Sequence, residues 1–236
     1  MWLAVDCGNT RVKWALIKDG ASFCASAVQS AATGRWRQLQ QAARHASEAW
    51  VSHVGSATTK RQLRAALQGC KRVVFVKSEV KSAGVINAYR PSSALGVDRW
   101  LGLVAAREGR RDVIIVSAGT AATIDALRRD GVFVGGAVLP GAHMAKDALA
   151  KHAGLTVSSP IRAVSTPPLC TRDAVHAGTL MSVAGAAMLL RRRLLPGAKF
   201  LVTGGDAESL LPLLPKTALH TPHLPIRGLI RLRGMR

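Results

Sequence analysis

Residues 112–141 read DVIIVSAGTAATIDALRRDGVFVGGAVLPG, and this stretch decides the fold. It begins with Val113 to Val116, an unbroken β-branched run that is typical of a strand buried on both faces. The run ends at Ser117-Ala118-Gly119-Thr120, and a second apolar strand follows. Because small residues let backbone N–H groups and hydroxyls approach a ligand closely, the pattern predicts a binding turn between two strands.

A similar pattern opens the chain. The strand Leu3 to Val5 runs into the turn Asp6 to Thr10, and Val12 to Ile17 forms a second strand. Two strand–turn–strand openings in one chain predict an α/β fold with a duplicated unit and a cleft between the halves. No low-complexity linker divides the chain, and we expect the halves to span 1–110 and 111–236.

The composition indicates a globular protein of a reducing compartment. The 236 residues are 48% hydrophobic, enough for one large core or two small ones. The four cysteines have no metal-ligand or CxxC spacing, which predicts free thiols: Cys7, Cys24, Cys70 and Cys170. The N-terminus lacks the basic start of a signal peptide, and no apolar run suggests a membrane span. We therefore expect a cytoplasmic protein without membrane contact.

The formal net charge of +20 attracts polyanions in general. The arginines are spread along the chain, aromatic residues do not alternate with them, and neither zinc-ligand spacing nor a helix-turn-helix is evident. The charge therefore reflects either a general compositional bias towards arginine or a positive surface that attracts an anionic partner. We expect contact with nucleic acid to be nonspecific if it occurs.

Three strands end in motifs that combine glycine with a hydroxyl or a carboxylate, namely DCGNT, SAGTAATID and TGGD. No G-x-G-x-x-G or G-x-x-x-x-G-K-[ST] sequence occurs, so a Rossmann or Walker nucleotide site is not supported. Phosphoryl transfer needs donors around the phosphates, a carboxylate for Mg²⁺ and a base near the acceptor hydroxyl. Asp98, which follows Gly96-Val97, is either this base or an ordinary first-turn acid of a helix.

In these motifs the chain resembles the type III pantothenate kinases, a branch of the superfamily that contains actin and the acetate and sugar kinases. The resemblance covers nearly the whole chain and rests on Asp6–Lys13, Gly96–Arg99, Gly119–Asp125, Gly135-Gly136 with Pro140-Gly141, and Thr171–Ala174. It implies two ribonuclease-H-like halves, as in the actin-like ATPases, each a mixed sheet flanked by helices. It also implies a homodimer and the ATP-dependent phosphorylation of pantothenate to 4'-phosphopantothenate, the first step of coenzyme A biosynthesis.

The resemblance further implies a role for each motif. The first phosphate loop would consist of Asp6, Cys7, Gly8, Asn9, Thr10, Arg11, Val12 and Lys13, with Asp6 acting on Mg²⁺ through water. Gly119 and Thr120 would contact ATP from the second loop, and Asp98 would be the catalytic base. The pantothenate pocket would be lined by Tyr89, Gly96, Val97, Asp98, Arg99 and Thr171.

The chain departs from the family pattern at Ser117. The resemblance implies an acid at this position, which binds a monovalent cation, K⁺ or NH₄⁺. A serine hydroxyl lacks that charge, and Asp125 at the end of the next strand is the nearest alternative acid in the sequence. A requirement for the cation is therefore not predicted from the sequence.

Two other functions remain open at this point. The positive charge would suit a nucleic-acid-associated transcriptional accessory protein on the same fold. The same fold would also serve a kinase that acts on a different small hydroxylated substrate.

Overall fold

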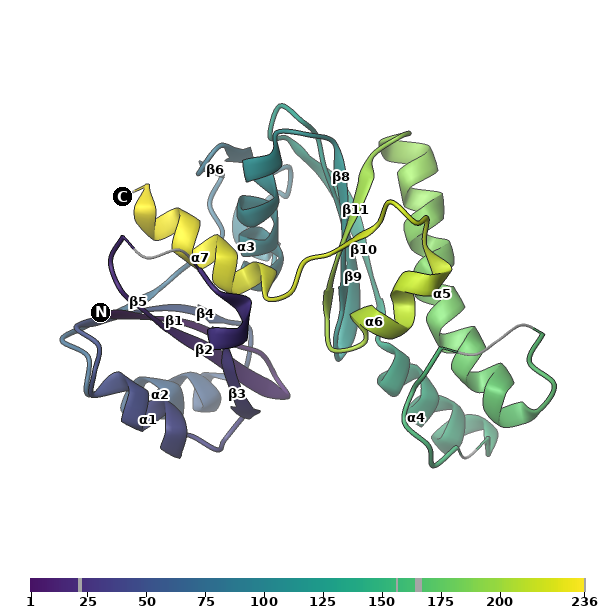
Figure 1. Ribbon diagram of the computed structural model, residues 1–236, viewed down its shortest axis with the longest axis horizontal. Coiled ribbons are helices and arrows are strands. Elements are labelled where there is room, and N and C mark those ends of the chain that lie inside the picture. Colours follow the sequence, from purple (N-terminus) through teal and green to yellow (C-terminus); the bar gives the residue numbers. More distant parts are fainter. Residues whose placement is uncertain (21–22, 156, 164–166, 236) are drawn as a thin grey trace. The chain divides into compact units, whose positions relative to one another are not determined.

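The computed structural model describes residues 1–20, 23–155, 157–163 and 167–235 (Figure 1). The chain forms two compact units. Unit 1 consists of Met1–Glu108 and His223–Arg236, and unit 2 of Gly109–Pro222. Each unit is built on one mixed five-stranded sheet.

The sheet of unit 1 has the strand order β3-β2-β1-β4-β5. Its strands are β1 (Trp2–Cys7), β2 (Arg11–Ile17), β3 (Gln29–Ala32), β4 (Glu48–His53) and β5 (Arg72–Phe75). The central strand β1 pairs antiparallel with β2 and parallel with β4. Successive side chains of a strand point to opposite faces, so Leu3, Val5 and Cys7 enter one core while Asp6 belongs to the other face.

Helices cover both faces of this sheet (Figure 1). The helices α1 (Arg37–Ala43) and α2 (Ala57–Ala66) pack on the face of Leu3 and Val5, and α3 (Val97–Ala106) and α7 (Leu224–Gly234) cover the other. Between β5 and α3 the chain forms a short hairpin of β6 (Lys81–Ser82) and β7 (Val85–Ile86), where the sequence predicted only a loop.

Unit 2 repeats the same strand order, β10-β9-β8-β11-β12. Its strands are β8 (Val113–Ala118), β9 (Ala121–Leu127), β10 (Phe133–Pro140), β11 (Lys199–Gly204) and β12 (Leu219–His220). Again the central strand β8 is antiparallel to one neighbour, β9, and parallel to the other, β11. The repeated order confirms the predicted α/β fold of two ribonuclease-H-like halves.

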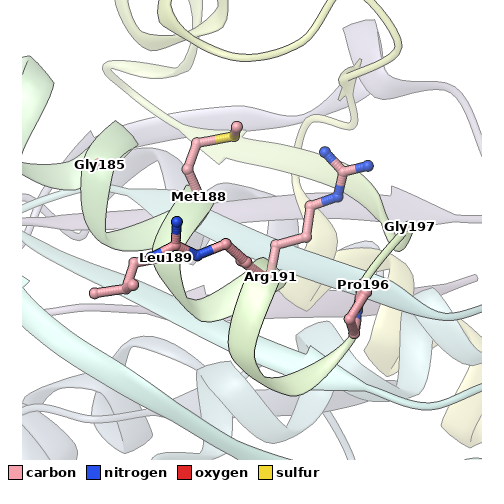
Figure 2. Close-up of a pocket in the computed structure, with 7 residues that line it drawn as sticks. Gly185, Met188, Leu189, Arg191, Pro196 and Gly197 are labelled. Carbon is pink, nitrogen blue, oxygen red and sulfur yellow. The ribbon is translucent and has the colours of Figure 1, made fainter.

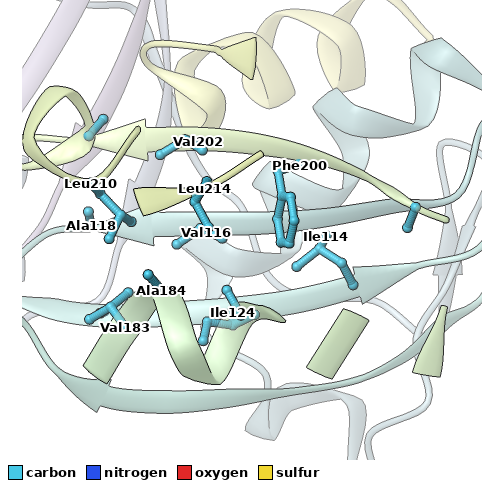
Figure 3. Close-up of a cluster of buried hydrophobic side chains, with 14 of the residues drawn as sticks. Ile114, Val116, Ala118, Ile124, Val183, Ala184, Phe200, Val202, Leu210 and Leu214 are labelled. Atoms are coloured by element: carbon cyan, nitrogen blue, oxygen red, sulfur yellow. The ribbon is translucent and has the colours of Figure 1, made fainter. Parts of the chain in front are cut away.

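One face of the unit 2 sheet is covered by α5 (Thr171–Leu194) and the short α6 (Ala207–Leu210), and α4 (Ala142–Ala153) follows β10 (Figure 1). The core on that face is aliphatic except for Phe200, with Ile114, Val116 and Ile124 from the sheet and Val183 from α5 (Figure 3). The scarcity of aromatic residues in the sequence predicts such a core.

Helix α5 is long and apolar enough, by length and composition alone, to cross a membrane, and it is the one described helix for which this holds. The sequence predicted no such segment. One side of α5 packs on the sheet through Val183, Ala184 and Ala187. Core helices of globular proteins meet the same criterion, and the packing of α5 on the sheet accounts for its apolar composition.

The predicted division at 110/111 lies close to the passage between the units, which follows Glu108. The C-terminal helix α7, which we expected in the second half, packs in unit 1 against α3. Its Arg233 bonds to Glu48 at 2.6 Å and to Asp19 at 2.8 Å, and its guanidinium lies 4.6 Å from the ring centre of Trp2. These long-range contacts have no local sequence signal.

Helix α7 approaches α3 so closely at Gly228 that a Cβ there would overlap the backbone carbonyl of Leu101. We predict that Gly228→Ala lowers the free energy of unfolding by about 1–3 kcal/mol, because the two helix backbones must separate. Gly234→Ala in the same helix has open space and is the matched control. Denaturant unfolding measures both, and equal stability of the two variants would contradict this packing.

Candidate active site

The candidate site of unit 1 begins with Asp6, the next-to-last residue of the central strand. The sheet register places Lys13 of β2 on one side of Asp6 and Ser52 of β4 on the other. The three side chains therefore share one sheet face at the end of the strand. Sequence reasoning found Asp6 and Lys13 but missed Ser52, since parallel pairing across 46 residues leaves no local pattern.

The pKa of the Asp6 carboxyl is raised to about 6. Burial is the largest cause, and the charge of Asp98 adds to it, whereas the Ser52 hydroxyl and Lys13 act in the opposite direction. The two predicted site carboxylates, Asp6 and Asp98, therefore influence each other electrostatically within unit 1. Paired carboxylates of this kind are suited to holding a cation or a proton.

The first predicted phosphate loop is a tight turn between β1 and β2. Its Gly8 N–H donates to the Arg11 carbonyl at 3.0 Å. Thr33 fixes the turn from the side, because its hydroxyl donates to the Gly8 carbonyl at 2.9 Å and its N–H to the Thr10 carbonyl at 3.0 Å. Asn9, Thr10 and Arg11 are exposed, whereas Cys7 and Val12 are buried in the core. The turn is thus held in place by Thr33 and presents polar side chains to solvent. Cys7, in contrast, contributes to the packing of the core.

Burial raises the pKa of the Cys7 thiol to about 11, with the Asp6 charge as a second cause. A thiol with so high a pKa stays protonated near neutral pH and is a poor nucleophile. This agrees with the structural role of Cys7 in the core.

Asp98 lies in the first turn of α3, where the positive end of the helix dipole favours a carboxylate. Its Oδ1 accepts the Arg99 N–H at 2.8 Å. A Cβ at Gly96 would come within 2.7 Å of this same oxygen. Gly96 therefore leaves the space that the Asp98 carboxylate occupies, which gives a physical reason for the G-V-D sequence.

Arg99 and Tyr89, both predicted to bind the substrate, lie together. The Arg99 Nη1 donates to the Tyr89 hydroxyl at 3.2 Å, and the guanidinium lies 5.5 Å from the centre of the Tyr89 ring. The buried Asn87 holds the Tyr89 backbone by accepting its N–H at 3.0 Å. Tyr89, Gly96, Val97, Asp98 and Arg99 thus form one group in unit 1.

In unit 2 the second predicted loop, Gly119-Thr120, is the turn between β8 and β9. A Cβ at Gly141 would overlap the carbonyl oxygens of Gly119 and Thr120, and the Gly141 N–H donates to Thr120 at 3.1 Å. From the other side, a Cβ at Gly204 would overlap the Ala118 carbonyl. Two neighbouring backbones therefore fix the shape of this turn.

The register around Ser117 in unit 2 corresponds to the register around Asp6 in unit 1. Ser117 lies between Thr123 of β9 and Thr203 of β11, both with hydroxyl side chains. The buried Asp125 is on the same face but aligns with Ile115, one step further along the sheet. The three positions nearest the turn are neutral and do not match an acid-based cation site.

Thr171 is the first residue of α5 and is exposed in unit 2. The other predicted pantothenate-pocket residues belong to unit 1, so the contacts described do not group Thr171 with them.

A separate groove of about 490 Å³ runs along the C-terminal part of α5 and the Pro196–Gly197 turn, between Met188, Leu189 and Arg191 (Figure 2). None of the predicted site residues lines it.

The raised pKa of Asp6 has a consequence for stability. Its unfolded value is near 3.8, so the folded state loses stability as the pH rises from about 4 to above 6, where the half-buried carboxyl ionises. We predict that Asp6→Asn stabilises the protein at pH 8 by up to about 3 kcal/mol, and much less near pH 4. Denaturant unfolding at both pH values measures this, with Asp147→Asn on α4 as the exposed control. A destabilised Asp6→Asn at pH 8 would contradict the assignment.

Comparisons with known proteins find relatives that match nearly the whole chain. The family model for type III pantothenate kinase matches residues 2–193. A type III pantothenate kinase of Thiobacillus denitrificans is 37% identical over 244 residues, which cover 98% of this chain and 95% of that protein. One of Nitrosococcus oceani is 36% identical, with 98% and 93% covered.

Solved structures share the fold. A Campylobacter jejuni protein described as a Baf family transcriptional activator aligns with a TM-score of 0.63 at 20% identity, covering 99% of this chain and 98% of that one. The activator of 2-hydroxyisocaproyl-CoA dehydratase from Clostridium difficile, solved with bound ADPNP, aligns with a TM-score of 0.53 at 16% identity, covering 98% and 91%. At these identities the structures inform the fold, whereas the sequence matches decide the family. The chain belongs to the type III pantothenate kinase family.

Proposed function

We propose that this protein transfers the γ-phosphoryl group of ATP to the hydroxyl of pantothenate, which yields 4'-phosphopantothenate and ADP for coenzyme A biosynthesis. The observation that carries the proposal is the group at the start of α3, where the Arg99 N–H orients the Asp98 carboxylate and the Arg99 guanidinium contacts Tyr89. Membership of the family supports the choice of substrate.

Asp98 is the residue that accepts the proton of the pantothenate hydroxyl. The hydroxyl oxygen forms a bond to the γ-phosphorus as the bond to the bridging β–γ oxygen breaks, and ADP leaves. The transition state of such transfers is loose, so the reaction depends more on alignment than on a strong base. The bond from the Arg99 N–H and the space at Gly96 hold the Asp98 carboxylate in one orientation.

Asp6 would hold Mg²⁺ through water. When bound, the ion would supply positive charge that stabilises the negative charge of the transferred phosphoryl group. Magnesium is usually held by one or two carboxylates together with phosphates and water, and Asp6 beside Asp98 fits this donor set. Within the described parts of the chain, no cluster of three or more His, Cys, Asp or Glu side chains forms a complete metal cage.

The remaining motif residues bind the two substrates. The exposed Asn9, Thr10 and Arg11 contact phosphate oxygens from the first turn, and Gly119 and Thr120 do so from the second. Arg99, with its planar guanidinium against Tyr89, is suited to the carboxylate of pantothenate. Thr171, the exposed first residue of α5, is also proposed to bind pantothenate.

We also propose that the protein is a cytoplasmic homodimer. One side of α5 exposes Met181, Met188 and Leu189 at helical spacing, although the opposite side is in the core. A second copy on this side would cover the apolar surface. The mass in solution, measured by light scattering, tests the dimer.

The alternatives have less support. The likeness to a protein described as a transcriptional activator concerns the fold alone, at 20% identity. We therefore do not propose a role in transcription. A kinase for another hydroxylated substrate is disfavoured because the relatives at 37% and 36% identity are type III pantothenate kinases.

The central prediction concerns Asp98→Asn. The variant keeps the shape of the side chain but cannot accept the proton, and we expect kcat to fall by about 10²–10⁴-fold. Pantothenate-dependent ADP release, coupled to NADH oxidation, measures this. Asp147→Asn on α4 changes an exposed acid and is the control. Full activity of Asp98→Asn, or no pantothenate-dependent ADP release by the unaltered protein, would overturn the proposal.

A second prediction concerns K⁺ and NH₄⁺. Because Ser117, Thr123 and Thr203 are neutral, we expect the rate to change little when K⁺ is replaced by a bulky organic cation. Introducing the missing charge by Ser117→Asp is expected to create stimulation by K⁺, with Thr123→Ser as a neutral control. A strict K⁺ requirement of the unaltered protein would show that other groups, such as Asp125, hold the ion.

A further inference from the structure

The turn between β8 and β9 is enclosed by two chain segments that are distant in sequence. One is the start of α4, where the Gly141 backbone lies against Gly119 and Thr120. The other follows β11, where Gly204 lies against Ala118 and the Asp206 N–H donates to the Ala118 carbonyl at 3.1 Å. The position of the turn therefore depends on how these two segments are held.

A side-chain pair joins the two segments directly. His143, the second residue of α4, places its Nε2 3.3 Å from Oδ1 of Asp206. The Asp206 side chain is only 15% exposed, whereas that of His143 is 53% exposed. Burial raises the pKa of Asp206, and the contact with His143 acts against that shift. The imidazole thus supports a carboxylate that burial would otherwise disfavour.

The pair closes a ring of contacts around the turn. The ring runs from Thr120 to Gly141, along the start of α4 to His143, across to Asp206, and back to Ala118. The backbone contacts alone fix each segment to the turn, and the side-chain pair fixes the segments to each other. If the pair is broken, the two segments can separate and the turn loses support on both sides.

We propose that His143 and Asp206 are positioning residues for the nucleotide, which act by holding the Ala118–Thr120 turn in its binding shape. The proposal rests on the proposed function in one respect, that Gly119 and Thr120 contact ATP. It assigns a role to the TGGD motif that the resemblance left without one, and it adds a histidine that the sequence reading did not select.

The test is the affinity for Mg²⁺-ADP, measured by titration calorimetry on the full chain. His143→Leu, Asp206→Ala and the double variant are compared with the unaltered protein. We expect each single variant to bind ADP about tenfold more weakly, as for loss of a hydrogen bond to a charged group. The double variant should be no weaker than either single variant, because both changes break the same contact. His143→Gln, which keeps an N–H donor, should restore binding.

Two controls separate positioning from general damage. His152→Leu on α4 and Glu208→Ala on α6 change exposed residues of the same helices and should bind ADP normally. In the kinase assay, the KM for ATP should rise in the His143 and Asp206 variants while the KM for pantothenate stays unchanged. Because His143 is exposed, its variants keep the test valid even if Asp206→Ala fails to fold.

Several outcomes would overturn the proposal. These are normal ADP binding by His143→Leu, additive losses in the double variant, or no ADP binding by the unaltered protein. Failure of this proposal can be distinguished from failure of the proposed function. If the protein binds ADP but shows no pantothenate-dependent turnover, the ADP affinities of the variants can still be compared.

Discussion

The structure depends on contacts between backbones that come too close for any side chain to intervene. At Gly141 and Gly204 such contacts fix the turn of unit 2, and at Gly228 a similar contact joins α7 to α3. Close packing of this kind tolerates little displacement, because a single added methyl group must move a whole segment. The glycines that allow these close backbone contacts therefore also leave the segments little freedom to move.

The site of unit 1 contains a carboxyl group, Asp6, in surroundings that disfavour its charge. Asp6 lies between Lys13 and Ser52 near the end of a buried strand, and burial together with the charge of Asp98 raises its pKa. An arrangement of this kind is unfavourable for folding but favourable for a cation, which relieves the repulsion when it binds. The raised pKa of Asp6 is thus explained if the site binds a cation when it functions.

Much of this could be predicted from the sequence, because the informative signals are local. The strand ends at Asp6, Ser117 and Gly204, and the helix start at Asp98, all lie within short motifs, and the repeated hairpins predicted the duplicated fold. The placement of α7 in unit 1 could not be predicted, since it depends on apolar packing and ion pairs formed across most of the chain. For the same reason neither Ser52 nor the His143–Asp206 pair was found: strand register and side-chain pairing between distant segments are set by the tertiary structure.

The duplicated units differ most in charge at corresponding positions. In unit 1 the position before the last residue of the central strand is Asp6, flanked by Lys13 and Ser52, and in unit 2 it is Ser117, flanked by Thr123 and Thr203. The strand pairing is repeated, but these three corresponding positions carry charged side chains only in the first unit. Phosphoryl transfer is stabilised by charged groups at the reacting atoms, whereas a turn with neutral donors is suited to binding alone. If the duplicated hairpin served packing alone, there would be no physical reason to pair Asp6 with Lys13 in one unit and two neutral hydroxyl side chains, Ser117 and Thr123, at the corresponding place in the other.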